Sequence, residues 1–217
     1  MVKHKLFINF LNFLGVFYIS ITMHSNNKEN VQNKVIPTVI EKEVKKALSY
    51  YPSLKETPIE FQIKSDMKNS FMKAQPKFWT LFSSRKTRKY RILVSDKFSL
   101  EGKELKLKDI PSDVLIGWFG HELGHIMDYK ERNTFNLAGF GISYYFSGNY
   151  IRKAERIADS YAVSHQMIDY LVKTKNFILN HADLSEKYKN KIKRLYVSPN
   201  ELLNIIEEQK TSKIINQ

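Results

Sequence analysis

Two histidines in one short segment have the spacing of a metal site. In His121-Glu122-Leu123-Gly124-His125 the imidazoles are four residues apart, and residues with this spacing project from the same face of an α-helix. Both rings can therefore reach one ion, as a zinc site with histidine ligands requires. Glu122 lies about 100° around the helix from His121, so it is better placed to take a proton from a metal-activated water than to join as a ligand.

A hydrolytic zinc site also needs a third protein ligand and an open position for water. The chain has no cysteine, so the donor must be His, Asp or Glu. The best candidate is Glu155, which follows His125 by 30 residues and leaves room for a turn and a returning helix. Asp159 comes one helical turn later, where its carboxylate can orient a ligating imidazole. We therefore expect zinc on His121, His125 and Glu155, with Asp159 beside them.

Other interpretations of these acidic residues stay open at this point. Glu155 and Asp159 could be solvated charges that pair along their helix with Arg152 and Arg156. In that case the histidine motif would be incidental, and the chain would lack a third ligand from this segment.

The histidine helix itself carries two competing donors. Asp128 or Glu131 could act as the third ligand, although each would have to bend back along its own helix.

The histidine motif together with Glu155-Arg156-Ile157-Ala158-Asp159 resembles the gluzincin branch of the zincin metallopeptidases. The second motif is more similar to the prenyl-protein and heat-shock endopeptidases than to thermolysin. The resemblance, over about residues 85–170, implies that His121, His125 and Glu155 bind zinc. It also implies that Glu122 is the general base and that Asp159 steadies a ligand histidine. Members of this branch often add a Tyr or His that stabilises the developing oxyanion, and the available candidates, none of which matches a family position, are His165, His181, Tyr144, Tyr145 and Tyr150.

The same resemblance implies a zincin-like α+β fold. In it, a small antiparallel sheet precedes a metal-binding helix pair and C-terminal helices. An edge strand, for which residues 89–95 are the candidate, would pair with extended substrate. The chain departs from the membrane-embedded members of the branch, because it has at most one transmembrane segment. It also lacks the third metzincin histidine, since that position is Glu131.

The local patterns around the motif are consistent with this order of elements. A capping box at Thr38 and Glu41 opens the first helix, and Ser112 or Asp113 is expected to cap the histidine helix. Alternating apolar residues predict strands before that helix. The expected elements are helix 38–50, strands 59–63, 77–83 and 89–95, and helices 114–129, 150–173, within 184–196, and 200–209, the last opened by a capping box at Ser198-Pro199-Asn200-Glu201.

Glycines on the histidine helix indicate close packing. Gly117, Gly120 and Gly124 fall on one stripe next to the histidine face. Each costs about 1 kcal/mol relative to alanine in a helix, so three on one side predict the close approach of another backbone. The aromatic, glycine-containing segment 135–149 is expected to line a cleft or form a lid. Buried packing and a loop that dips into a membrane are the alternatives.

The N-terminus has the pattern of a targeting segment. Lys3, His4 and Lys5 precede the apolar stretch 6–21, which is typical of a secretory signal or an N-terminal anchor; a buried core helix is the alternative. We expect residues 1–25 to be a signal peptide or membrane anchor. Residues 26–217 are then one zincin-like metallopeptidase domain, exported and either periplasmic, extracellular or anchored to a membrane through the N-terminus.

Composition limits the remaining choices. The 217 residues, 42% of them apolar, are enough for one core and too rich in aromatic residues for a disordered chain. The net charge of +13 favours loose association with a membrane or an anionic envelope surface. A self-repelling soluble surface is the simpler interpretation. The apolar N-terminus argues against intracellular nucleic acid as a partner.

The leading prediction is a zinc-dependent endopeptidase that hydrolyses proteins or peptides, with Glu122 as the general base acting on a metal-activated water. Two alternatives belong to other classes. One is a catalytically silent binding module with a zincin fold. The other is a basic envelope-binding or nucleic-acid-binding protein in which the histidine motif is incidental.

Overall fold

The computed structural model describes residues 33–65, 67, 70–100, 103–134, 136–137, 147–180, 186–195, 197–198, 200–202 and 204–208. All of them belong to the unit 32–217. The expected signal or anchor at 1–25 and most of the segment 135–149 lie outside the described residues. Among the helices that are described, none combines the length and the hydrophobicity needed to cross a bilayer.

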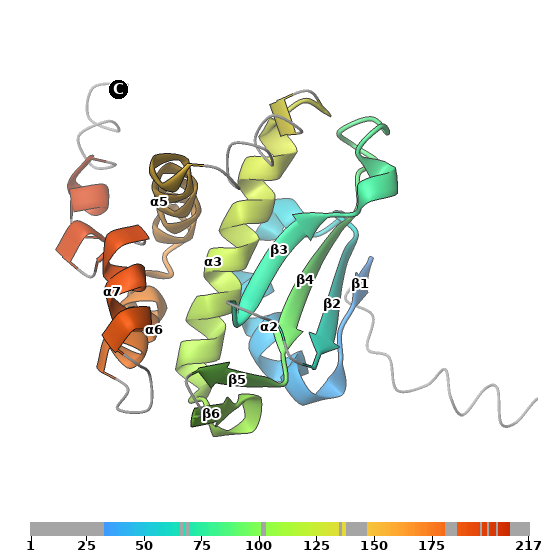
Figure 1. Ribbon diagram of the computed structural model, residues 1–217. Helices are drawn as coiled ribbons and strands as arrows, with labels where there is room; N and C mark the ends of the chain where they lie inside the picture. The colour runs from blue at the N-terminus through green and yellow to red at the C-terminus, as the bar shows by residue number, and fades with distance from the viewer. Residues whose placement is uncertain are drawn as a thin grey trace, which may run out of the picture. The chain divides into compact units, whose positions relative to one another are not determined.

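A small mixed sheet lies beside a group of helices, so the expected α+β class is confirmed (Figure 1). Its spatial order is β1-β2-β4-β3; β1, β2 and β4 are mutually parallel, and β3 is antiparallel to β4. Our expectation of an antiparallel sheet is therefore wrong. The reason is that β4 lies between β2 and β3 and runs parallel to β2. The bounds are β1 Lys34–Val35, β2 Ile59–Lys64, β3 Met72–Pro76 and β4 Tyr90–Ser95.

The edge strand next to the helices is β3, and the expectation that residues 89–95 form this edge is wrong. Those residues form β4, which lies inside the sheet. A strand was also expected at 77–83, but a 3-10 helix, η3 (Phe78–Thr80), is found there. The apolar pattern was misleading because its aromatic side chains are exposed instead of packed on the core.

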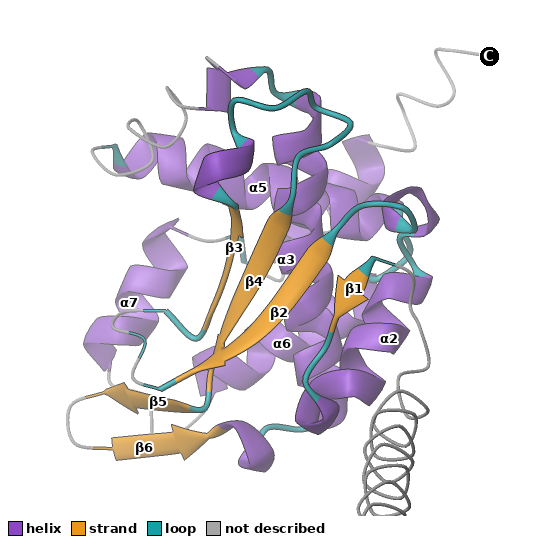
Figure 2. Cartoon of the chain, turned by 90° about the vertical axis from the view of Figure 1, so that its right-hand side faces the viewer, coloured by secondary structure: helices purple, strands orange, loops and turns teal. Residues whose placement is uncertain are grey.

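One face of the sheet packs on helices, which lie behind the strands in Figure 2. Buried residues alternate along β2 and β4, where Phe61 and Ile92 are examples, and Phe61 meets Phe119 edge to face at 5.8 Å between ring centroids. The opposite face is polar. On that face the Arg91 guanidinium donates to Gln75 Oε1 at 2.9 Å across the β3–β4 pair. Period-two alternation thus orients the sheet toward the helices.

The helix α3 (Ser112–Glu131) is central, and it contacts β3 and the helices α2 (Glu41–Ser49), α5 (Gly148–Ser164) and α6 (Ile168–Asn180). It is buried on most sides because it is apolar on most sides. The expected cap by Ser112 or Asp113 is wrong. The N-cap position is Pro111, which has no side-chain hydrogen bond among the described residues, and Ser112 Oγ donates to Glu43 instead.

A buried arginine completes the other end of α3. Arg88 is 1% exposed, and its guanidinium donates to the carbonyl oxygens of Tyr129 and Arg132 at 3.0 Å each. Carbonyls in the last turn of a helix have no partner within the helix. The cation therefore supplies those bonds and also opposes the negative end of the helix dipole.

Residues 150–173 were expected to be one helix, but they divide between α5 and α6. The break lies at Gln166, whose φ of 63° is left-handed. The amide of Met167 donates to Ala162 O and that of Gln166 to Val163 O, which is the Schellman pattern that ends a helix. The turn lets both helices pack on α3.

The remaining elements flank this core. The hairpin β5 (Lys97–Leu100) and β6 (Lys103–Lys106) was not expected. The first capping box is wrong, since Thr38 begins the 3-10 helix η1 (Thr38–Ile40) and α2 starts at Glu41 without a side-chain cap among the described residues. The last capping box is confirmed, because Glu201 N donates to Ser198 Oγ and Ser198 N to Glu201 Oε2. Further helical residues are η2 (Pro52–Leu54), η4 (Leu107–Asp109), α7 (Glu186–Leu195) and 200–202 with 204–208.

Candidate metal centre

Two imidazoles from α3 form the first half of the site. His121 and His125 are 8% and 6% exposed, and their rings meet edge to face with centroids 4.7 Å apart. The four-residue spacing on a continuous helix explains why both rings lie on the same side. This arrangement is the one that the motif predicts.

Glu155 on α5 brings a carboxylate to the same point. It is 2% exposed, and its Oε2 lies 2.9 Å from His121 Nε2 and 3.6 Å from His125 Nε2. One donor atom from each of the three residues falls within 4.8 Å of the others. In a tetrahedral zinc site with ligands about 2.0–2.1 Å from the ion, donor atoms are about 3.3 Å apart. The described residues therefore include a buried His-His-Glu group that could hold a metal ion.

The tight packing of α3 against its neighbours depends on glycine. A Cβ added to Gly124 would lie 2.3 Å from Ala158 O on α5, and one added to Gly117 would lie 2.3 Å from Tyr170 O on α6. Only a residue without a side chain fits at these two crossings. Gly117 and Gly124 thus have the packing role that we expected, whereas Gly120 faces the side chain of Met167. Gly124 sits beside the helix crossing that joins the two histidines to Glu155.

Asp159 lies one turn beyond Glu155 and fixes the orientation of His121. Its Oδ1 is 2.8 Å from His121 Nδ1, so the imidazole Nδ1–H points to Asp159 and leaves Nε2 toward Glu155. Its Oδ2 accepts from the ammonium group of Lys175 on α6 at 2.8 Å. Asp159 is fully buried and Lys175 is 9% exposed. The result is a buried network of three side chains, Lys175, Asp159 and His121, that links three helices.

The charges of this group are strongly coupled. Burial alone would lower the pKa of His121, but the carboxylates of Asp159 and Glu155 outweigh it and raise that pKa to about 10. Burial alone would raise the pKa of Glu155, yet His125 and His121 hold it well below its usual range. Burial would likewise raise the pKa of Asp159, and Lys175 and His121 keep it lowered. In the metal-free chain these charges favour the protonated form of His121, whose Nε2 faces Glu155.

Glu122 points from α3 toward the edge of the sheet. Its Oε2 accepts a hydrogen bond from the backbone amide of Ala74 on β3 at 2.6 Å. Burial raises the pKa of Glu122 above its usual value, while the two imidazoles act in the opposite direction. Tyr129, which stacks on His125 with ring centroids 6.0 Å apart, donates weakly to Ala74 O at 3.4 Å. Glu122 and Tyr129 thus connect the site to β3 through the backbone of Ala74.

The competing assignments for the acidic residues do not hold. Asp128 forms an ion pair with Arg132 Nε at 2.9 Å and is not part of the His-His-Glu group. The guanidinium groups of Arg152 and Arg156 bind Glu201 and Glu208 instead of Glu155 and Asp159.

The two histidines differ in how their second nitrogen is held. His125 Nδ1 is buried and has no hydrogen-bond partner among the described residues, whereas His121 Nδ1 has Asp159. Among the oxyanion candidates, His165 stacks on Tyr51, and its Nδ1 is hydrogen-bonded to the carbonyl oxygen of Tyr161. His181, Tyr144 and Tyr145 lie outside the described residues.

Two parts of this site were missed from the sequence. Lys175 has no signal, because a lysine in a helical pattern is ordinarily a surface residue. The strand 72–76 was missed because its short Met72-Lys73-Ala74-Gln75-Pro76 pattern is weaker than the aromatic run that follows it.

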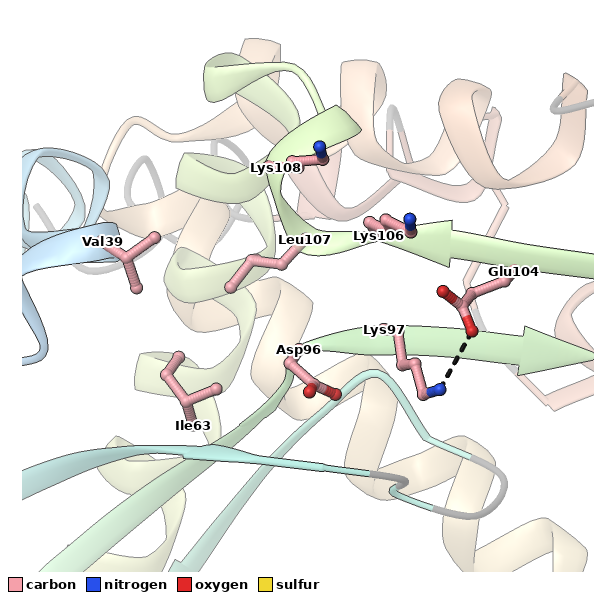
Figure 3. A pocket seen from close by; sticks show the side chains of 8 residues that line it. All are labelled: Val39, Ile63, Asp96, Lys97, Glu104, Lys106, Leu107 and Lys108. Carbon is pink, nitrogen blue, oxygen red and sulfur yellow. Dashed lines mark ion pairs between the residues drawn. The ribbon is translucent and has the colours of Figure 1, made fainter.

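A separate hollow of about 360 Å³ lies between the strand ends and the β5–β6 hairpin (Figure 3). It includes none of the three donor residues, and its Glu104 is paired with Lys97 at 3.0 Å. The hollow is therefore separate from the His-His-Glu group. In comparisons with known proteins, no family model, no curated protein and no solved structure matches the chain.

Proposed function

We propose that the chain is a zinc-dependent endopeptidase that binds Zn²⁺ through His121, His125 and Glu155. The observation that carries this proposal is the convergence of two imidazole nitrogens and one carboxylate oxygen within 4.8 Å, from three buried residues on two helices. Zinc is favoured among metals because two histidines and one glutamate match its preferred donors in hydrolytic sites. Three ligands also leave a coordination position for substrate or water.

The roles of the protein groups follow from where they point. When bound, zinc would polarise the scissile carbonyl and lower the pKa of a coordinated water toward about 7. Glu122 would take a proton from the attacking water at a carboxylate oxygen and pass it to the leaving amine nitrogen. Asp159 holds the Nδ1–H of His121 and so keeps Nε2 directed at the ligand position.

The outer edge of β3 supports an extended peptide as the substrate. Lys77 N donates to Lys89 O and Ser95 N to Phe71 O, and in an antiparallel pair such bonding positions alternate. With this register the backbone groups of Met72 and Ala74 point away from β4. An extended chain could therefore bind there by adding a strand. Pro76 has no amide hydrogen and cannot donate a hydrogen bond to an added strand, so donation from the outer edge of β3 ends at this residue.

The hydrogen bond between Glu122 and Ala74 has a consequence for binding. The same amide that a substrate strand would use is held by the general base at 2.6 Å. We propose that an incoming peptide carbonyl takes over this amide, which frees the carboxylate of Glu122 to face the attacking water. Binding and activation of the base are then coupled through Ala74.

The test is Glu122→Gln in the full chain, assayed with a broad library of quenched fluorescent peptides. Zinc content should be retained and cleavage should fall by about 10²–10⁴-fold, the usual contribution of a general base. Glu131→Gln, an exposed carboxylate at the end of the same helix, is the matched control and should keep full activity.

Other outcomes would support other functions. A fully active Glu122→Gln variant would remove Glu122 from the mechanism. A wild-type chain that binds zinc and cleaves nothing in the library would be a silent binding module. A chain without metal that binds anionic polymers with steep salt dependence would be a basic binding protein.

A further inference from the structure

The connection between β3 and β4 presents a cluster of exposed aromatic side chains. Phe78, Trp79 and Phe82 are 60%, 84% and 78% exposed. Their rings meet edge to face, with centroids 5.2 Å apart for Phe78 and Trp79 and 6.2 Å apart for Phe78 and Phe82. The three rings therefore form one apolar cluster centred on Phe78, which we call the aromatic tip.

The fold holds this tip in place. At its base Lys77 N donates to Lys89 O at 2.8 Å, and Thr80 Oγ1 accepts from Lys89 N at 3.1 Å. Leu81 packs inward against the core, and its carbonyl accepts from Thr134 Oγ1 at 2.8 Å. The inward Leu81 and the outward rings on either side show that the exposure of the tip is a feature of the folded segment.

The charged residues of the segment that carries the tip are all cations. Residues 77–89 contain five Lys or Arg and no Asp or Glu. Lys77 is paired with Glu60 and Arg88 is buried at the end of α3. Three cations, Arg85, Lys86 and Lys89, remain exposed. The acidic residue Glu131 lies beside Arg85, which donates to its backbone carbonyl.

This combination fits a lipid surface better than other partners. Trp and Phe rings enter the boundary between headgroups and acyl chains, while Lys and Arg remain with anionic headgroups. Single-stranded nucleic acid would need separate ring faces on which bases could stack, but these rings pack against one another. The net charge of +13 adds attraction to an anionic membrane, and the apolar stretch 6–21 is typical of a chain delivered to one.

We propose that the aromatic tip and the cations Arg85, Lys86 and Lys89 dock the protein on an anionic lipid bilayer. Because β3 leads directly into the tip, docking would hold the edge strand close to the membrane surface. The proposal rests on exposed rings and charges and not on the metal centre. A chain that binds no zinc could still dock, and a zinc enzyme could fail to dock.

The experiment uses tryptophan fluorescence as a local probe in the full chain. The sequence has two tryptophans, Trp79 and Trp118. Trp118→Phe keeps a ring against Phe71 and leaves Trp79 as the single reporter. Vesicles of phosphatidylglycerol and phosphatidylcholine should shift Trp79 emission to the blue, and brominated acyl chains should quench it. Phosphatidylcholine vesicles alone should produce little change.

Matched variants in the same background test the two parts of the proposal. Lys86→Gln and Lys89→Gln should each weaken binding to anionic vesicles about fivefold, whereas Lys42→Gln on α2 should change it less. Phe82→Ser should reduce quenching, and Val39→Ser, which removes another exposed apolar side chain, should not.

Three results would overturn the proposal. One is Trp79 emission that stays unshifted and unquenched while the chain cosediments with vesicles, because another segment would then be the one that binds. A second is an equal response to neutral vesicles. The third is a shift with an unfolded protein such as casein and none with vesicles, which would assign the tip to protein docking.

Discussion

Replacing Lys175 with methionine should weaken both the fold and the metal centre. The Lys175 ammonium lies 2.8 Å from Asp159 Oδ2, and the Asp159 side chain is fully buried. Methionine keeps most of the volume of the side chain but removes its charge. Breaking a buried ion pair by removing one partner costs about 3–5 kcal/mol. That is a large fraction of the total of about 5–15 kcal/mol typical of a folded domain.

The effect on the metal should follow from the same chain of contacts. Without Lys175, Asp159 is free to turn from His121 Nδ1, and partners that orient a ligand histidine are worth about 10–100-fold in metal affinity. The assays are denaturant unfolding of the metal-free chain and zinc titration against a coloured chelator. Lys175→Arg keeps the cation and should recover part of both losses.

Two further variants separate charge from packing. Lys173→Met removes a lysine two residues earlier on α6 whose ion pair with Asp113 is exposed, and it should leave stability and zinc affinity nearly unchanged. Lys175→Met combined with Asp159→Asn removes both charges and should regain part of the lost stability, because the Asp159 carboxylate is then no longer buried with His121 as its one remaining partner among the described residues. If Lys175→Met matches Lys173→Met in both assays, the buried network of Lys175, Asp159 and His121 has no role in the site.

Three other predictions test packing, protonation and helix capping. Gly124→Ala should cost about 1–3 kcal/mol and lower zinc affinity, because its Cβ would meet Ala158 O at 2.3 Å, whereas Gly120→Ala faces a flexible methionine tip and should do less; equal effects in a zinc titration would contradict this. Because nearby carboxylates raise the pKa of His121 to about 10, its contribution to the stability of the metal-free chain is complete below about pH 6.5 and is lost as pH rises to 10. The melting temperature should fall over that range less steeply in His121→Gln, and identical slopes would refute the assignment. Arg88→Met should lower the free energy of unfolding by at least about 1.5 kcal/mol without reducing the zinc affinity of the folded chain; an unchanged unfolding midpoint would contradict its capping role.

The buried His-His-Glu group could be predicted because its signal is local and its possible donors are few. Helical spacing alone places His121 and His125 on one face. The absence of cysteine and the need for a third donor then point to Glu155. Lys175 could not be found in this way, since its place beside Asp159 depends on how α6 packs against the other helices.

The fold was predictable in class but not in strand order. Parallel pairing of β2 with β4 is a non-local choice that alternation does not encode. The break at Gln166 was missed because left-handed helix ends usually carry glycine, and none is present there. The segment with Phe78, Trp79 and Phe82 was predicted to be a buried strand because the apolar pattern of a sequence does not show whether another element covers its side chains.

The zinc content of the purified full chain, measured for wild type and Glu155→Ala side by side, tests the proposed centre most directly. We expect roughly one zinc per wild-type chain and loss of that zinc in the variant, because the carboxylate would supply one of three protein ligands. A folded wild-type chain that takes up no zinc when zinc is supplied, or a variant that binds it equally well, would contradict the proposed centre.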